Sequence, residues 1–146
     1  MKKINALIAE KVMRWQKKNM PLKGGPAENL CWTDGINYWP IDTYDPHRDM
    51  NYAMEALKAA FILNNTDLGP DFHHYEIQYS GIYKQYFATC DVETENETLE
   101  MEAQADTPAM ACCICALRAC DVSETEISDA LKLNLAPLQT LQSTLK

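Results

Sequence analysis

Residues 106–120, DTPAMACCICALRAC, hold four of the six cysteines of the chain, and their interpretation decides the fold. Thr107 suits the N-cap of a helix and Pro108 its first residue, so the sequence predicts a helix that begins here. Apolar residues at helical spacing form one stripe: Met110, Cys113, Ile114, Leu117 and Cys120. Free cysteine behaves as a small hydrophobe, so we interpret this stretch as a helix packed closely against a sheet.

A metal or redox site is the alternative interpretation of these cysteines. Cys112 and Cys115 have C-x-x-C spacing, but zinc sites usually pair two such units and the sequence holds no second one. The other candidate ligands are scattered: Cys31, Cys90, His73 and His74. A redox pair begins its helix, whereas these cysteines lie a turn further in. We therefore expect no metal site, no cofactor and no disulfide bonds.

The length and composition fit one globular domain in the cytoplasm. The chain has 146 residues, of which 47% are hydrophobic and 23% charged. We expect a single domain over residues 1–136 and a loosely held tail over 137–146. No apolar run is long enough to span a membrane, and Glu10 interrupts the apolar part of the first residues too early for an export signal.

The charge of −8 is unevenly distributed. Residues 1–23 hold seven bases and one acid, which gives +6 and leaves −14 for the rest. Between Lys84 and Arg118 there are seven acids and no Lys, Arg or His. Binding to phosphates needs clustered positive charge, so this acidic body argues against direct contact with nucleic acid. It permits the opposite role, binding to a basic surface.

The first half of the chain predicts two helices separated by an aromatic loop. An apolar stripe predicts an amphipathic helix over residues 4–18: Ile4, Leu7, Ile8, Val12 and Trp15. Residues 27–44 form a loop in which Asp34-Gly35 is a hairpin signal. Asp45 can cap a second helix over residues 46–63.

The second half predicts three strands and two helices. Alternating patterns mark strands over residues 74–80, 83–93 and 98–105. After the cysteine helix, Ser123 and Glu126 form a capping box for a short fourth helix. The predicted fold is α+β, a single-domain α/β sandwich of order α-α-β-β-β-α-α with a small antiparallel sheet.

Two surfaces are candidate binding sites. Asp91, Glu93, Glu100 and Glu102 should share one face of the last hairpin, with Glu95 and Glu97 in its turn. They form either an ordinary solvated face or a negative patch for a partner. Four large aromatic residues either cap a core edge or contact a ligand: Trp32, Tyr38, Trp39 and Tyr44.

Three segments carry a resemblance to a known family. NALIAEKVMRW (5–15), PHRDMNYAMEALKA (46–59) and ADTPAMACCICALRA (105–119) resemble segments of the phage ABA sandwich domain family. The resemblance implies an α/β sandwich in a phage or prophage protein. It implies no activity and supplies no catalytic residues, and the cysteines and the fourth helix depart from the family pattern.

No catalytic motif is present, so we expect a binding protein and not an enzyme. The leading hypothesis is a phage-encoded accessory protein in the host cytoplasm, an acidic anti-defence inhibitor that resembles anti-CRISPR proteins. Its partner would be a host defence protein with a basic surface. The first alternative is a sponge that sequesters a nucleotide immune signal, and the second is a small hydrolase or metal-binding protein. The sequence does not decide whether the protein is a monomer or a homo-oligomer.

Overall fold

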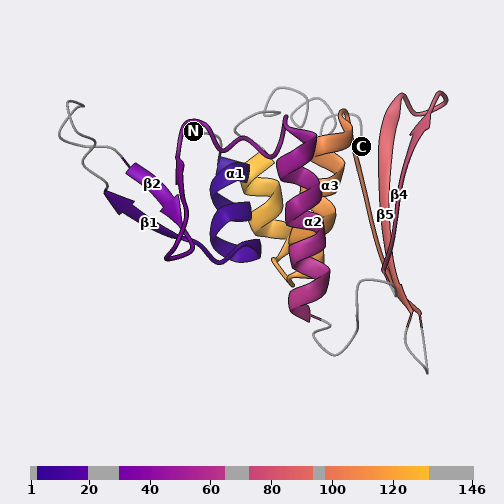
Figure 1. The fold of residues 1–146 in the computed structure, drawn as a ribbon. Helices are drawn as coiled ribbons and strands as arrows, with labels where there is room; N and C mark the ends of the chain where they lie inside the picture. Colours follow the sequence, from indigo (N-terminus) through magenta and orange to yellow (C-terminus); the bar gives the residue numbers. More distant parts are fainter. Residues whose placement is uncertain (1–2, 20–29, 65–72, 94–97, 132–146) are drawn as a thin grey trace.

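Two antiparallel sheets stand on opposite sides of a group of helices (Figure 1). The structure is a computed structural model, and it describes residues 3–19, 30–64, 73–93 and 98–131. The predicted α+β class is confirmed. The prediction of one sheet is wrong, because the described residues form two sheets of three strands each. The expected tail lies outside the described residues.

The N-terminal segment is helical for less of its length than predicted. Helix α1 (Lys3–Leu7) continues as a π-helix, η1 (Ile8–Val12), and strand β1 (Gln16–Asn19) follows. Arg14 has a positive φ of 58° and lies where the helix gives way to the strand. The predicted helix over 4–18 is therefore wrong beyond Val12, because the last polar residues pair with another strand instead.

The aromatic segment supplies the partners of β1. Strands β2 (Leu30–Thr33) and β3 (Tyr38–Pro40) complete a small sheet of order β1-β2-β3. The hairpin predicted at Asp34-Gly35 is confirmed. Oδ1 of Asp34 accepts hydrogen bonds from two backbone amides of the turn, and Gly35 has φ +101°, which a residue with a side chain rarely adopts.

Helix α2 (Met50–Asn64) begins four residues later than predicted. The main-chain carbonyl of Asp45 accepts from the amides of Arg48 and Asp49, which closes a separate turn before the helix. The Asp49 side chain then accepts from the amide of Asn51 in the first helical turn. Asp45 therefore caps the preceding turn and not the helix.

The larger sheet and the cysteine helix match the sequence predictions closely. The sheet has the order β4-β5-β6, with β4 (His73–Ser80), β5 (Gln85–Glu93) and β6 (Thr98–Ala105). Helix α3 (Pro108–Ala119) begins at the predicted cap, where the Thr107 hydroxyl accepts from an amide one turn on. Residues 124–131 form the short fourth helix.

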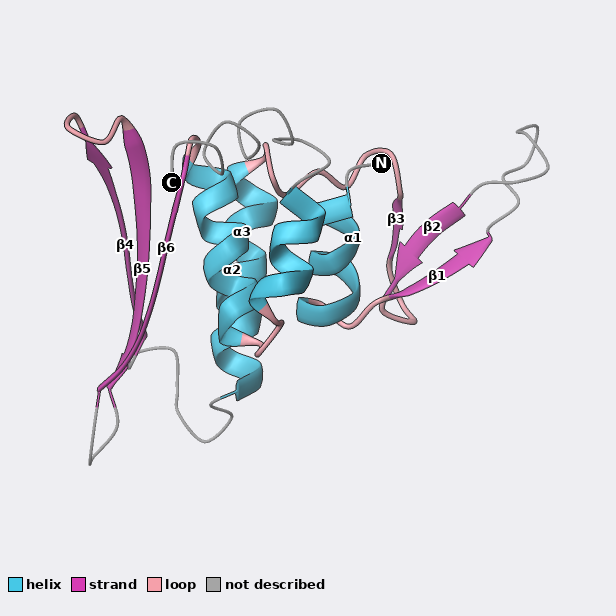
Figure 2. Cartoon of the chain, turned by 180° about the vertical axis from the view of Figure 1, so that it is seen from behind, coloured by secondary structure: helices cyan, strands magenta, loops and turns pink. Residues whose placement is uncertain are grey.

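Helix α3 covers one face of the larger sheet (Figure 2). The facing side chains in the sheet are small and buried, among them Ala88, Cys90 and Ala103. Three cysteines of the helix are fully buried: Cys112, Cys113 and Cys115. This burial confirms the prediction that they are core residues. Cys112 and Cys115 lie close to Cys90 of the sheet, where small side chains on both elements let the helix approach closely. Cys113 lies near Tyr44 and Asp45 instead.

Candidate functional site

The acidic residues of the larger sheet lie on the face turned away from α3. Cys90 points into the core, so its neighbour Asp91 points outward. Asp91 lies directly opposite Glu100, and Thr89 lies opposite both Glu102 and Glu76. We call the set Glu76, Asp91, Glu100 and Glu102 the acidic face. The predicted clustering of carboxylates is therefore confirmed for Asp91, Glu100 and Glu102, and the register adds Glu76.

The remaining predicted acidic residues are placed only in part. Glu93 continues β5 and pairs with Thr98 in the register. Glu95 and Glu97 lie outside the described residues. Glu76 was not predicted to join this cluster, because it is the only acidic residue in the sequence of β4. The pairing of β4 with β5 places it close to the acidic residues of β5 and β6.

No lysine or arginine occurs in the sequence of β4, β5 or β6. Arg118 of α3 reaches this sheet and donates to the main-chain oxygen of Glu102 at 2.9 Å. The same guanidinium pairs with the carboxylate of Glu124 at 2.8 Å. Arg118 is therefore engaged at the edge of the sheet and forms no ion pair with the acidic face.

Asp91 is the least exposed member of the acidic face. Its Oδ1 atom is closed off from solvent and has no hydrogen-bond partner among the described residues. Glu76, Glu100 and Glu102 are exposed. A carboxylate that has already lost part of its hydration loses less on being covered by a partner, so Asp91 suits the centre of an interface.

The aromatic segment divides between core and surface. Trp32 and Tyr44 are buried, with 0% and 1% of their surface exposed. Trp39 is half-buried and stacks on Trp15 with ring centroids 4.0 Å apart. Tyr38 is 41% exposed. Burial thus assigns Trp32 and Tyr44 to the core and leaves Tyr38 as the member most open to a ligand.

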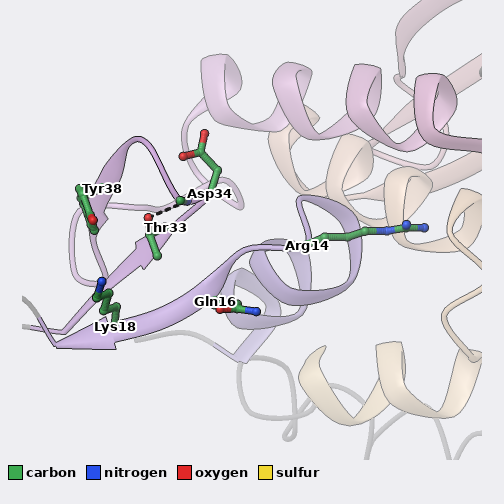
Figure 3. Close-up of a pocket in the computed structure, with 7 residues that line it drawn as sticks. Arg14, Gln16, Lys18, Thr33, Asp34 and Tyr38 are labelled. Atoms are coloured by element: carbon green, nitrogen blue, oxygen red, sulfur yellow. Dashed lines mark hydrogen bonds between the residues drawn. The ribbon is translucent and has the colours of Figure 1, made fainter.

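A pocket of about 300 Å³ lies on the smaller sheet (Figure 3). All three strands, the turn between β2 and β3, and the residue two positions before β1 contribute to its lining: Arg14, Gln16, Lys18, Thr33, Asp34, Gly35 and Tyr38. Figure 3 shows Lys18 beside Tyr38, whereas the guanidinium of Arg14 points away toward the helices. This pocket was not predicted from the sequence, because residues 14–18 were expected to be helical. Only the pairing of β1 with β2 and of β2 with β3 places Gln16 and Lys18 on the same sheet as Tyr38.

A buried polar cluster ties the N-terminal helix to the segment before α2. Asn5 donates to Oδ1 of Asp45 at 2.9 Å, and its own oxygen accepts from the backbone amide of His47. Nδ1 of His47 and the Nε of Arg48 also contact the Asp45 carboxylate. Burial acts to raise the pKa of Asp45, but these contacts outweigh it and lower that pKa. The cluster is fully used in joining two elements.

The cysteine thiols are poor nucleophiles. Burial raises the pKa of Cys112 to about 11, and burial with the neighbouring Cys112 raises that of Cys115 to about 12. Cys113 is fully buried, and its pKa is raised well above its usual value by burial. Thiol chemistry proceeds through the thiolate, so these side chains stay protonated and unreactive near neutral pH.

Comparison with known proteins adds no relative: no protein-family model matches the chain, and neither curated proteins nor solved structures give a significant match. The resemblance to the phage ABA sandwich family accordingly stays an expectation. Across the described part of the chain, no helix is both long and apolar enough to cross a membrane.

Proposed function

We propose that the protein acts by stoichiometric binding, with its acidic face docked on a positively charged surface of another protein. The supporting observation is the arrangement of four carboxylates over three adjacent strands that contain no lysine or arginine. Side chains on neighbouring strands lie about 5 Å apart, and alternate residues of one strand about 7 Å apart. At these separations the fields of the four charges add together, which attracts a basic partner.

The acidic face works against the stability of the protein itself. Asp91 and Glu100 lie directly opposite in the register, and like charges in that position repel one another. A basic partner would remove this repulsion on binding. Complementary charges also speed the encounter and reject wrong partners, so an acidic face gains selectivity from the same residues that cost stability.

The class of partner follows from this charge. Proteins that bind nucleic acids present grooves lined with lysine and arginine, and a compact set of carboxylates can occupy such a groove in place of phosphates. The resemblance to a phage family suggests a host defence protein of that kind, in the cytoplasm of a bacterial cell. The protein would then act as an anti-CRISPR-like inhibitor without catalysing a reaction.

Cross-linking in bacterial cells tests this proposal with two matched variants. The acidic-face variant carries Glu76→Gln, Asp91→Asn, Glu100→Gln and Glu102→Gln. The control variant neutralises four exposed acids on other elements: Glu10, Asp42, Glu55 and Glu126. Both variants remove four negative charges, so they differ only in where the charge is lost.

The proposal expects the wild-type protein and the control variant to capture the same basic protein, and the acidic-face variant to lose it. A loss of about 1 kcal/mol at two of the four sites weakens binding well over tenfold. An equal loss in both variants would show that overall charge decides capture. Retention of the partner by the acidic-face variant would move the interface to another surface.

A further inference from the structure

The pocket on the smaller sheet has the opposite charge from the acidic face. Strand alternation puts Gln16 and Lys18 on the pocket side of β1 and turns Lys17 to the other side. There the Lys17 ammonium lies 5.4 Å from the ring centroid of Trp32. Lys18 lines the pocket, is exposed, and forms no ion pair within the described ranges.

The acid that lines the pocket does not neutralise Lys18. Oδ1 of Asp34 accepts from the amides of Ile36 and Asn37 at 2.8 and 2.6 Å, and these bonds lower its pKa. Figure 3 shows its carboxylate directed away from Lys18. The Asp34 carboxylate therefore stays ionised and is engaged by the turn that it stabilises, not by Lys18.

The hydroxyl of Thr33, which also lines the pocket, is already hydrogen-bonded within the protein. Thr33 donates to the main-chain oxygen of Asn37 at 2.8 Å and accepts from the amide of Gly35 at 3.0 Å. Three polar groups then remain for a ligand: the ammonium of Lys18, the amide of Gln16 and the phenol of Tyr38. Ammonium and amide groups donate hydrogen bonds, and the exposed ring of Tyr38 offers a flat apolar surface.

We propose that this pocket binds a small phosphorylated molecule with a flat ring, of the size of a mononucleotide. Lys18 would hold the phosphate, Gln16 would donate a hydrogen bond, and Tyr38 would stack on the ring. A volume of about 300 Å³ lies at the small end of ligand sites, which fits a molecule of this size. The site uses Tyr38 and not the buried Trp32 and Tyr44.

Titration of the full chain with adenosine monophosphate, followed by amide NMR shifts, tests the proposal. Lys18→Gln removes the proposed phosphate contact, and Lys17→Gln is its matched control because it removes the same charge from the opposite side of β1. Ribose 5-phosphate, which lacks the ring, is titrated in parallel against the wild-type protein and Tyr38→Ala.

The proposal expects saturable binding of adenosine monophosphate, with the largest shifts in residues 16–18 and 33–38. Lys18→Gln should weaken it about 10- to 100-fold, as for the loss of a charged hydrogen bond, and Lys17→Gln by less than about threefold. Tyr38→Ala should weaken binding of the nucleotide but not of ribose 5-phosphate. Equal losses in the two lysine variants, or no saturable binding at millimolar concentrations, would overturn the proposal. Neither result would bear on the acidic face.

Discussion

The two sheets share a topology and differ in almost everything else. Each has three antiparallel strands in sequence order, and the helices lie between the two sheets. Strands β1, β2 and β3 are four, four and three residues long, whereas β4, β5 and β6 have eight, nine and eight. The smaller sheet carries Lys17 and Lys18, whereas the larger carries the acidic face and no lysine or arginine.

The difference places two surfaces of opposite charge on one small chain. Such short strands are marginal by themselves and need a packed face. In the smaller sheet, this packed face is formed by Trp32, which is fully buried, and by Trp39, which stacks on Trp15. Helix α3 packs on the inner face of the larger sheet against β5 and β6, so the outer face is free to carry mutually repelling charges. The helices between the sheets keep the basic pocket apart from the acidic face.

Among the variants that test this comparison, Trp32→Ala should lower the free energy of unfolding most, because it removes the most deeply buried side chain of the smaller sheet. Truncation of a fully buried aromatic side chain costs about 3–5 kcal/mol, so we expect this loss in the free energy of unfolding in urea. Tyr38→Ala, in the same sheet but 41% exposed, should change it by about 0.5 kcal/mol or less. Similar effects of the two variants would show that the smaller sheet is not anchored through Trp32.

Asp45→Asn tests the polar cluster that connects the N-terminal helix α1 to the segment before α2. The pKa of Asp45 is lowered in the folded protein, so its ionised form stabilises the fold. Loss of hydrogen bonds to a charged group should lower the free energy of unfolding by about 1.5–3 kcal/mol near neutral pH. This advantage is present above the unfolded pKa of about 3.9 and disappears as pH falls through the lowered folded pKa. If the difference in free energy of unfolding between the wild-type protein and the variant stayed the same in acid, the ionised Asp45 carboxylate would not be what stabilises the fold.

Cys112→Ser tests whether the larger sheet is held by apolar packing of α3, because the Cys112 thiol lies close to Cys90 of β5. A serine hydroxyl buried without a partner costs about 1–3 kcal/mol, which thermal or urea unfolding would detect. Cys120→Ser is the control, since that side chain is only partly buried at the end of the helix. Stoichiometric zinc in the purified protein, lost together with the cysteines, would replace the packing account by a metal site.

The smallest expected effect belongs to the acidic face. The acidic-face variant should unfold at the same or slightly higher urea concentration than the wild-type protein, with a gain of up to about 1 kcal/mol from relieved repulsion. A clear loss of stability would mean that these carboxylates support the fold, which would weaken the case that they serve a partner.

The larger sheet and α3 were predictable because their signals are local. The predicted alternation holds for Met101, Ala103 and Ala105, which all contribute to the core from β6, and Thr107 caps α3 as expected. Each pattern lies within one element, and the structure preserves it. Three members of the acidic face, Asp91, Glu100 and Glu102, were predictable for the same reason, because alternation along β5 and β6 determines which side chains share a face. Glu76 was not, because only the pairing of β4 with β5 brings it beside them.

The smaller sheet was not predictable because its signals are long-range. Trp15 completes a helical stripe with Ile4 and Val12, yet the helix ends before it and its ring stacks on Trp39. Residues 16–19 are all polar and show no alternation, so only pairing with β2 makes them a strand. The pocket depends on that pairing, and sequence spacing alone gave no sign that Lys18 and Tyr38 would meet.

An amide NMR titration of the full chain with an arginine-rich peptide tests most directly whether the acidic face is a docking surface. The peptide stands in for the basic groove of a partner, and the assay needs no identified host protein. We expect the largest shifts in β4, β5 and β6 around Asp91, Glu100 and Glu102, a weakening as salt rises, and loss of the shifts in the acidic-face variant but not in the control variant. Shifts of equal size in the acidic-face variant, or shifts concentrated elsewhere in the chain, would contradict the account.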